Sequence, residues 1–243
     1  MNMRDLKDFT PLFDETVGRY PETIVYGLCN LEGMLPDSLS HLPRGISLAV
    51  RMGEELMDSV HAGPTAPYFA EYTRVNALIN GLTAAMAELL ERHGYRARAI
   101  HSSERVDAVN IAGEFPHKTG AVQAGLGWIG RNCQLVTRAF GPRVRLGTVL
   151  TDAPLAEPPA PVQRSFCGDC DACVRVCPAG ALTGAKWTRG MERARILDVH
   201  KCDAWKKAHY AEFESNVCGI CTSACPMGTV RRKEKKKKVE EAR

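Results

Sequence analysis

The stretch C-G-D-C-D-A-C-V-R-V-C-P at positions 167–178 decides how this chain is built. Its four cysteines are separated by two, two and three residues, and a proline follows the last one. A similar stretch, C-G-I-C-T-S-A-C-P, occupies positions 218–226, and Cys202 stands alone between the two runs. Eight of the ten cysteines of the chain therefore lie in its last third. Cysteines grouped in this way favour a metal or redox site over scattered core thiols.

The spacing C-x2-C-x2-C-x3-C-P is typical of bacterial ferredoxins with two 4Fe–4S clusters, in which the fourth cysteine of a run binds the cluster of the other run. Two-residue gaps let a tight loop aim successive thiolates inward, and the proline fixes the direction in which the chain leaves. All eight cysteines are used if each cluster takes four. We therefore predict cluster one on Cys167, Cys170, Cys173 and Cys225, and cluster two on Cys177, Cys202, Cys218 and Cys221.

Zinc and disulfides are the alternatives for these cysteines. Structural zinc takes four ligands in separate tetrahedra, and this four-cysteine run is not its usual format. Disulfides require an oxidising compartment. Residues 1–25 carry charged side chains throughout and lack the apolar segment of a secretory signal. No stretch is long and apolar enough to suggest a membrane span. We expect a cytoplasmic protein without a membrane partner, whose thiols stay reduced.

Composition divides the chain of 243 residues into three parts. The proline-rich stretch A-P-L-A-E-P-P-A-P-V at 153–162 fits an extended linker. We predict an α/β cofactor and substrate domain over 1–155, a double-cluster domain over 156–230, and a basic, disordered tail over 231–243. The tail holds eight basic and three acidic residues, so the net charge of +4 arises there. It is either a solvated end or a contact for RNA phosphates.

The first 155 residues alternate strand-like and helix-like patterns. The clearest helix is expected from Pro67 to His93, where apolar residues recur at steps of three and four, and Gly94 follows as a stop. Strands are expected at 23–31, 46–52, 95–101, 134–137 and 145–151, the last two joined by a turn at 141–142. This alternation predicts a sheet covered by helices.

A glycine-rich segment, P-H-K-T-G-A-V-Q-A-G-L-G-W-I-G-R-N, occupies positions 116–132. Three glycines within six residues mark backbone with an unusual φ or backbone that another group approaches closely. The segment does not fit a dinucleotide-binding loop, because the strand and the G-x-G-x-x-G order are missing. Taken alone, the motif is equally compatible with a structural turn.

Together with R-L-G-T-V-L-T-D-A-P-L (145–155) and the crossed cysteine runs, this segment resembles the epoxyqueuosine reductases and, more distantly, the respiratory reductive dehalogenases. The resemblance covers roughly residues 20–228. It implies an α+β protein, with a nitroreductase-like α/β sandwich domain followed by a bacterial ferredoxin-like double 4Fe–4S domain. It also implies a cobalamin, to which the two clusters deliver single electrons.

The resemblance gives several residues an expected role beside the corrin. Backbone at Gly125, Leu126, Gly127 and Gly130 would lie against the ring where side chains could not. Trp128 would pack beside the ring or the nucleotide tail, or else is an ordinary core residue. Arg143 and Arg145 would pair with propionamide or phosphate groups, or else are exposed strand charges.

The chain departs from the resemblance at the expected proton donor. In the family, an aspartate in a V-D-x-x-P-type segment precedes A-G-L-G-W, whereas this chain has Val109-Asn110 near that position. A general acid needs reach and a suitable pKa, so Glu114, His117 and Lys118 are the candidate donors. Full-length epoxyqueuosine reductases also continue into a helical-repeat domain, whereas this chain stops soon after Cys225.

The expected function is an iron–sulfur oxidoreductase whose substrate is a small molecule, a protein-bound group or a tRNA. An external donor of the ferredoxin or flavodoxin type would supply its electrons. Two alternatives stay open. One is an electron-transfer protein that docks a partner and holds no cobalamin, and the other is a true tRNA epoxyqueuosine reductase.

Overall fold

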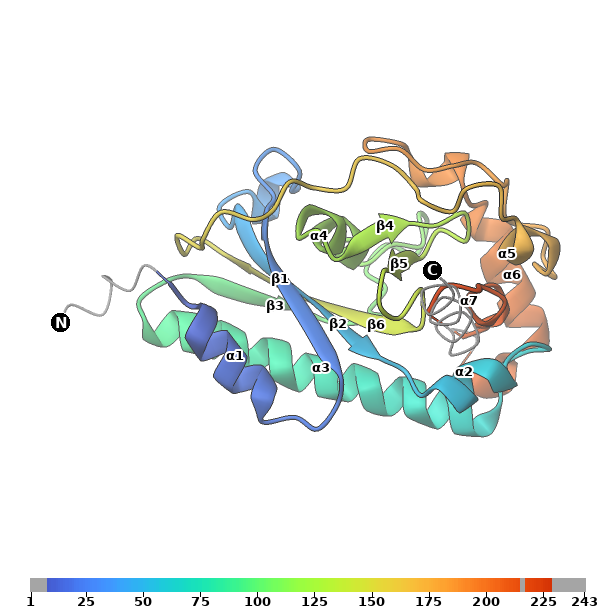
Figure 1. The fold of residues 1–243 in the computed structure, drawn as a ribbon, viewed down its shortest axis with the longest axis horizontal. Helices are drawn as coiled ribbons and strands as arrows, with labels where there is room; N and C mark the ends of the chain where they lie inside the picture. Colours follow the sequence, from blue (N-terminus) through green and yellow to red (C-terminus); the bar gives the residue numbers. More distant parts are fainter. Residues whose placement is uncertain (1–7, 215–216, 229–243) are drawn as a thin grey trace, which may run out of the picture. The chain divides into compact units, whose positions relative to one another are not determined.

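The computed structural model describes residues 8–214 and 217–228 (Figure 1), so the predicted basic tail lies outside the described residues. The chain forms two compact units, each assembled from three stretches of sequence. The first unit comprises Met1–Arg51, Arg74–Leu126 and Arg145–Val162. The second unit comprises Met52–Thr73, Gly127–Val144 and Gln163–Arg243.

The first unit is built on a sheet of four strands in the order β1-β2-β6-β3. β1 pairs antiparallel with β2, and β3 pairs antiparallel with β6. These strands confirm four of the predicted segments, and the apolar and β-branched residues of β1, β2 and β6 favour a strand. Their bounds are β1 Ile24–Asn30, β2 Arg44–Arg51, β3 Ala97–Ile100 and β6 Val144–Thr151.

Helices cover both faces of this sheet (Figure 1). On one face, α1 (Thr10–Gly18) and α3 (Ala66–Arg92) bury apolar side chains against β2 and β6. On the other face, α4 (His117–Gln123) packs on β1 and β2. Successive residues of β6 point to opposite faces of the sheet. Val149 packs in the core that contains α1 and α3, and Leu150 packs in a second core on the other face. The 3-10 helix η2 (Asp37–Leu39) adds Leu39 to the second core. The predicted mixture of helices and strands is confirmed.

The long helix α3 begins and ends one residue before its predicted bounds. Its apolar stripe is fully buried at Val75, Ile79, Leu82 and Met86. The helix ends at Arg92, and Gly94 follows with φ +83°, a left-handed conformation that glycine adopts without the penalty of a Cβ.

The proline-rich stretch at 153–162 has no regular secondary structure, as expected, but it is not a free linker. Ala153 and Leu155 are buried in the core of the first unit. The amide of Val162 donates to the Val122 carbonyl at 3.4 Å. Apolar side chains among the prolines therefore fasten this stretch to the sheet domain. The domain division at 155/156 stays a prediction.

The second unit contains short elements joined by loops. β4 (Gly127–Ile129) and β5 (Leu135–Thr137) form an antiparallel hairpin, of which the sequence predicted only β5. The helices are α2 Glu54–Ser59, α5 Ala172–Arg175, α6 Val199–His209 and α7 Ile220–Ser223, with 3-10 turns η3 Arg193–Arg195 and η4 Ala211–Phe213. α7 packs against α2 and α5. Among the described residues, no helix combines the length and apolarity needed to cross a membrane.

Candidate functional site

Four thiols surround one cavity of about 160 Å³ in the second unit. They belong to Cys167, Cys170, Cys173 and Cys225, the four residues predicted for cluster one. Three come from the first cysteine run and one from the second, so the fold brings the two runs together. The remaining lining is Arg131, Asn132, Val136, Phe166, Pro226 and Met227. Soft thiolates around a largely apolar cavity are the donor set that a 4Fe–4S cluster takes.

Local backbone geometry presents these thiols. The first run turns at Gly168, which has φ +58°, and the Cys170 amide donates to the Cys167 carbonyl at 3.2 Å. Helix α5 then carries Cys173, which is buried. Cys225 comes one residue after the end of α7, beyond Ala224, and its amide donates to the Thr222 carbonyl at 3.2 Å. Burial raises the pKa of the Cys225 thiol to about 11, and only a bound metal would favour the thiolate there.

The second predicted set also shares one neighbourhood. Burial raises the pKa of the Cys221 thiol, and the charges of Cys218, Cys202 and Cys177 raise it further. Cys202 lies on α6, whose N-cap Asp198 accepts a hydrogen bond from the Lys201 amide. The thiols predicted for cluster two therefore lie in one part of the second unit, to which Cys173, predicted for cluster one, also belongs. The ligand assignment itself stays a prediction.

Close packing within the second unit explains two of the motif glycines. A Cβ at Gly127 would lie 2.3 Å from the Val136 carbonyl oxygen, across the β4–β5 hairpin. A Cβ at Gly130 would lie 2.6 Å from Asn132 Oδ1. Glycine is thus required here for the chain to pack on itself. Gly125 differs, because it is exposed and has φ +72°, and Leu126 beside it is half-buried.

Trp128 lies in the core of the second unit. Only 2% of it is exposed, and its ring meets Phe166 edge-on with 5.4 Å between centroids. Phe166 lines the thiol cavity, so Trp128 supports that cavity from behind. These contacts match the core role that was the alternative for this residue.

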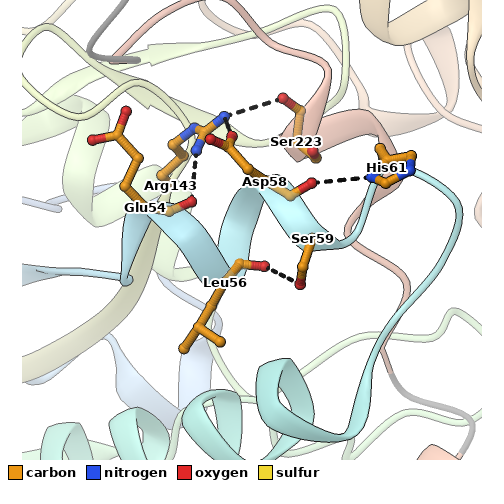
Figure 2. A network of polar contacts seen from close by, with 7 residues as sticks. All are labelled: Glu54, Leu56, Asp58, Ser59, His61, Arg143 and Ser223. Carbon is orange, nitrogen blue, oxygen red and sulfur yellow. Dashed lines mark hydrogen bonds and ion pairs between the residues drawn. The ribbon is translucent and has the colours of Figure 1, made fainter.

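Arg143 is buried and held by an internal polar network (Figure 2). Its Nη2 pairs with Asp58 Oδ1 at 2.6 Å and donates to the Ser223 carbonyl at 3.3 Å, while Nη1 donates to the Glu54 carbonyl at 3.3 Å. Arg143 thereby ties α2 to α7, the helix that carries Cys221 and precedes Cys225. Its predicted alternative as an exposed strand charge is wrong, because the side chain is only 3% exposed.

Arg145 is the second residue of β6 and belongs to the first unit. Its Nε donates to Asn76 Oδ1 at 3.0 Å, and its Nη2 is hydrogen-bonded to the Ser103 hydroxyl. The side chain is half-buried, so the guanidinium is partly accessible. Of the two arginines predicted to pair with a cofactor, this one has the less enclosed surroundings.

The candidate proton donors occupy different surroundings within the first unit. Glu114 forms an ion pair with Arg98, with 2.6 Å between Oε1 and Nη2. His117 begins α4, with Nε2 3.2 Å from the His101 carbonyl and Nδ1 2.9 Å from Thr148 Oγ1. A carbonyl only accepts, so Nε2 carries the hydrogen and Nδ1 accepts from the hydroxyl. Lys118 follows and is half-buried.

His117 is expected to stay neutral down to about pH 4. Burial lowers its pKa to about 4, the His101 carbonyl opposes this, and the Arg145 charge adds to it. Because the unfolded chain binds this proton near pH 6.5, folded stability is lost as pH falls from about 6.5 to about 4, on the order of 1–2 kcal/mol at pH 5. An NMR titration of ring-labelled histidine should show a His117 midpoint of about pH 4. A midpoint near 6.5 would contradict this neutral, weakly acidic His117.

Sequence reasoning missed residues directly beside the motifs that it identified. Arg131 and Asn132 line the thiol cavity, although only the glycines before them were given a role. Their position at the end of A-G-L-G-W-I-G was the available signal. Asp107 was also passed over. Its carboxylate accepts hydrogen bonds from the Asn110 amide at 2.9 Å and from Asn110 Nδ2 at 2.7 Å.

Comparison with known proteins agrees with this geometry. The family described as the 4Fe–4S double cluster binding domain matches residues 166–241. Epoxyqueuosine reductase of Bacillus anthracis is 32% identical over 124 residues, which are 47% of this chain and 30% of that protein. The enzyme of Pseudomonas aeruginosa is 31% identical over 158 residues, 65% of this chain and 40% of that protein. The chain thus spans less than half the length of these relatives.

Solved structures show the same fold. A catabolic reductive dehalogenase in complex with 3-bromo-4-hydroxybenzoic acid has a TM-score of 0.65 and 22% identity, over 84% of this chain and 30% of that one. Epoxyqueuosine reductase with an epoxyqueuosine-modified tRNA-Tyr stem loop has a TM-score of 0.59 and 18% identity, over 93% and 66%.

The Bacillus subtilis epoxyqueuosine reductase, solved with its catalytic aspartate loop swung out of the active site, has a TM-score of 0.58 and 16% identity, over 94% of this chain and 67% of that one. These matches confirm the expected α+β fold. The chain therefore carries a 4Fe–4S double cluster binding domain in a fold shared with reductive dehalogenases, and it is a homologue of the epoxyqueuosine reductases over part of their length.

Proposed function

We propose that this protein is an iron–sulfur oxidoreductase resembling epoxyqueuosine reductase. The observation that carries the proposal is the cavity surrounded by Cys167, Cys170, Cys173 and Cys225, within a segment that matches the double-cluster family. When bound, the two clusters would supply one-electron transfer, and a cobalamin would supply cobalt chemistry at the substrate. The substrate class is a small molecule, a protein-bound group or a tRNA, and an external ferredoxin or flavodoxin would provide electrons.

The residues of the second unit would hold the clusters and limit their solvent contact. Two sets of four thiols provide the ligands. Val136, Phe166 and Met227 form apolar walls of the cavity, and such walls lower the local dielectric and influence potential. Arg143 donates a hydrogen bond to the Ser223 carbonyl and so fixes the end of α7, which lies just before Cys225.

Of the residues predicted to contact the corrin, we keep those that are not enclosed by their packing within the protein. Gly127 and Gly130 are needed by the hairpin, Trp128 is enclosed beside Phe166, and Arg143 is bound internally. Gly125, Leu126 and Arg145 of the first unit are exposed or half-buried. We therefore assign the corrin contacts chiefly to these three residues.

Asp107 is the better carboxyl group for proton delivery. It lies in a tight loop, in which Asp107 bridges to Ala112 and Ile111 adopts φ +50°. A β-branched residue with this φ is strained, and such strain clusters at functional loops. A catalytic aspartate on a loop is also what the solved Bacillus subtilis relative has. Glu114 is already paired with Arg98, and a neutral His117 is a weak acid.

Replacing Asp107 by asparagine is expected to lower turnover by about 100-fold or more, the usual contribution of a general acid. Iron content and cobalamin affinity should be unchanged. The matched variant is Glu114→Gln, which removes a carboxylate of the same loop region and should leave turnover within about threefold. Single-turnover rates of the reduced enzyme provide the measurement. Equal losses in both variants would count against a specific role for Asp107.

Anaerobic reconstitution tests the proposed function itself. About eight irons per chain are expected, and about two zincs without visible absorbance would refute the cluster assignment. Added cobalamin should shift to its base-off spectrum and co-elute with the protein. A spectrum that stays that of the free cofactor would favour the electron-transfer alternative. Turnover of an epoxyqueuosine-containing anticodon stem loop would establish the tRNA alternative.

A further inference from the structure

Arg131 occupies the tip of the β4–β5 hairpin, where it lines the cavity of the cluster-one thiols. Its Nη2 donates to the Gly168 carbonyl at 3.2 Å, inside the first cysteine run. The neighbouring Asn132 directs Nδ2 toward the Cys221 carbonyl at 3.5 Å, inside the second run. The hairpin tip therefore contacts the backbone of both runs.

One donor of Arg131 is left over in this arrangement. Its Nε is buried and has no hydrogen-bond partner among the described residues. Among the described residues no ion pair joins its guanidinium to a carboxylate, although its charge helps to lower the pKa of nearby Asp169. A buried N–H without an acceptor costs on the order of 1–3 kcal/mol. Arg143 Nε and Trp128 Nε1 of the same unit also lack a partner among the described residues, but of these three residues Arg131 is the one that lines the thiol cavity, where a ligand would supply the acceptor.

The cavity beside Arg131 is where that acceptor would be. Four thiolates and the inorganic sulfides of a cluster carry net negative charge, and their sulfur atoms accept hydrogen bonds. Hydrogen bonds to these sulfurs and nearby charge are the established means by which a protein sets cluster potential. A fixed cation stabilises the reduced, more negative state more than the oxidised state, so it raises the reduction potential.

We propose that Arg131 binds cluster one through an Nε–H hydrogen bond to a cluster sulfur and raises the reduction potential of that cluster. The Nη2 bond to Gly168 holds the guanidinium plane in place for this contact. The inference rests on the clusters of the proposed function and does not depend on cobalamin or on any substrate. It also explains why a cation directly follows the glycines of the motif.

Redox titration of the reconstituted protein, followed by EPR, tests the inference. Arg131→Met should lower the potential of one cluster by about 59 mV or more, a tenfold change for a one-electron couple. Arg131→Lys keeps the charge but not the planar donor, and should give a smaller decrease. The matched control is Arg138→Met, because Arg138 lies over the Phe166 ring at 5.3 Å but does not line the cavity.

A second readout detects the contact directly. Protein labelled with ¹⁵N-arginine should show a nitrogen hyperfine coupling in the pulsed EPR spectrum of one reduced cluster, and Arg131→Lys should lose it. If the Arg131→Met protein binds fewer irons than the parent, the comparison is made with Arg131→Lys instead. Reduction potentials and a nitrogen coupling in Arg131→Lys equal to those of the parent would overturn this inference but leave the proposed function standing. A parent protein without four-iron clusters would overturn the proposed function as well.

Discussion

Replacing Gly141 by alanine is expected to prevent assembly of the second unit around cluster one. Gly141 has φ +57°, and a Cβ there would lie 1.9 Å from the Met227 carbonyl oxygen. Met227 follows Cys225 by two residues and lines the same cavity. Overpacking costs about 1–3 kcal/mol and the left-handed conformation of an alanine another 1–2 kcal/mol. Iron content should fall from about eight to about four per chain, with a lower Tm.

Gly180→Ala separates these two costs. Gly180 has φ +56°, almost the same as Gly141, but nothing lies within 4 Å of its Cβ position. This variant therefore carries the conformational cost without the collision, and it should keep both clusters. The comparison uses iron analysis and thermal unfolding of the two purified variants. Equal behaviour would show that the close approach of Met227 has no importance for the cluster.

The second large effect concerns the crossed ligand sets. Cys225→Ser should remove the same cluster as Cys167→Ser, because both thiols line one cavity. Cys177→Ser, by contrast, should remove the same cluster as Cys218→Ser, although Cys177 belongs to the first run. Each variant should retain about four irons and one of two EPR signals.

The control for ligand loss is Cys29→Ala. Cys29 is buried in β1, and burial raises its thiol pKa to about 12, so it is not a thiolate at neutral pH. This variant should keep both signals. Should Cys167 and Cys177 variants instead lose one and the same signal, each run would hold its own cluster and the crossed arrangement would be wrong.

The elements that the sequence predicted well have strong local signals. The apolar stripe of α3, with Val75, Ile79 and Leu82 at helical spacing, determined that helix to within one residue at each end. The strands of the sheet were recognisable for the same reason, since buried residues such as Leu48 and Val149 lie in β-branched, apolar runs. The cysteine spacing alone predicted which four thiols line the cavity.

What the sequence did not reveal depends on contacts between distant residues. β4 is short and begins with a glycine, and only its pairing with β5 makes it a strand. In the sequence Arg143 resembles a surface charge. Only its contacts with Asp58 and Ser223, each about 80 residues away, show that it is buried. Arg131 and Asn132 are ordinary polar residues in sequence, and only the carbonyls of Gly168 and Cys221 show what they support.

The Arg143 network has a consequence for the order of events during synthesis. Asp58, Arg143 and Ser223 come from three separate stretches of the second unit (Figure 2). A ribosome makes the residues at 52–73 and 127–144 long before α7 and Cys225 emerge, so the nascent chain holds Arg143 with only part of its final enclosure. On the proposed ligand set, cluster one could be completed only after translation has passed Cys225. Iron loading would then be a late step, which follows the synthesis of α2 and of the β4–β5 hairpin.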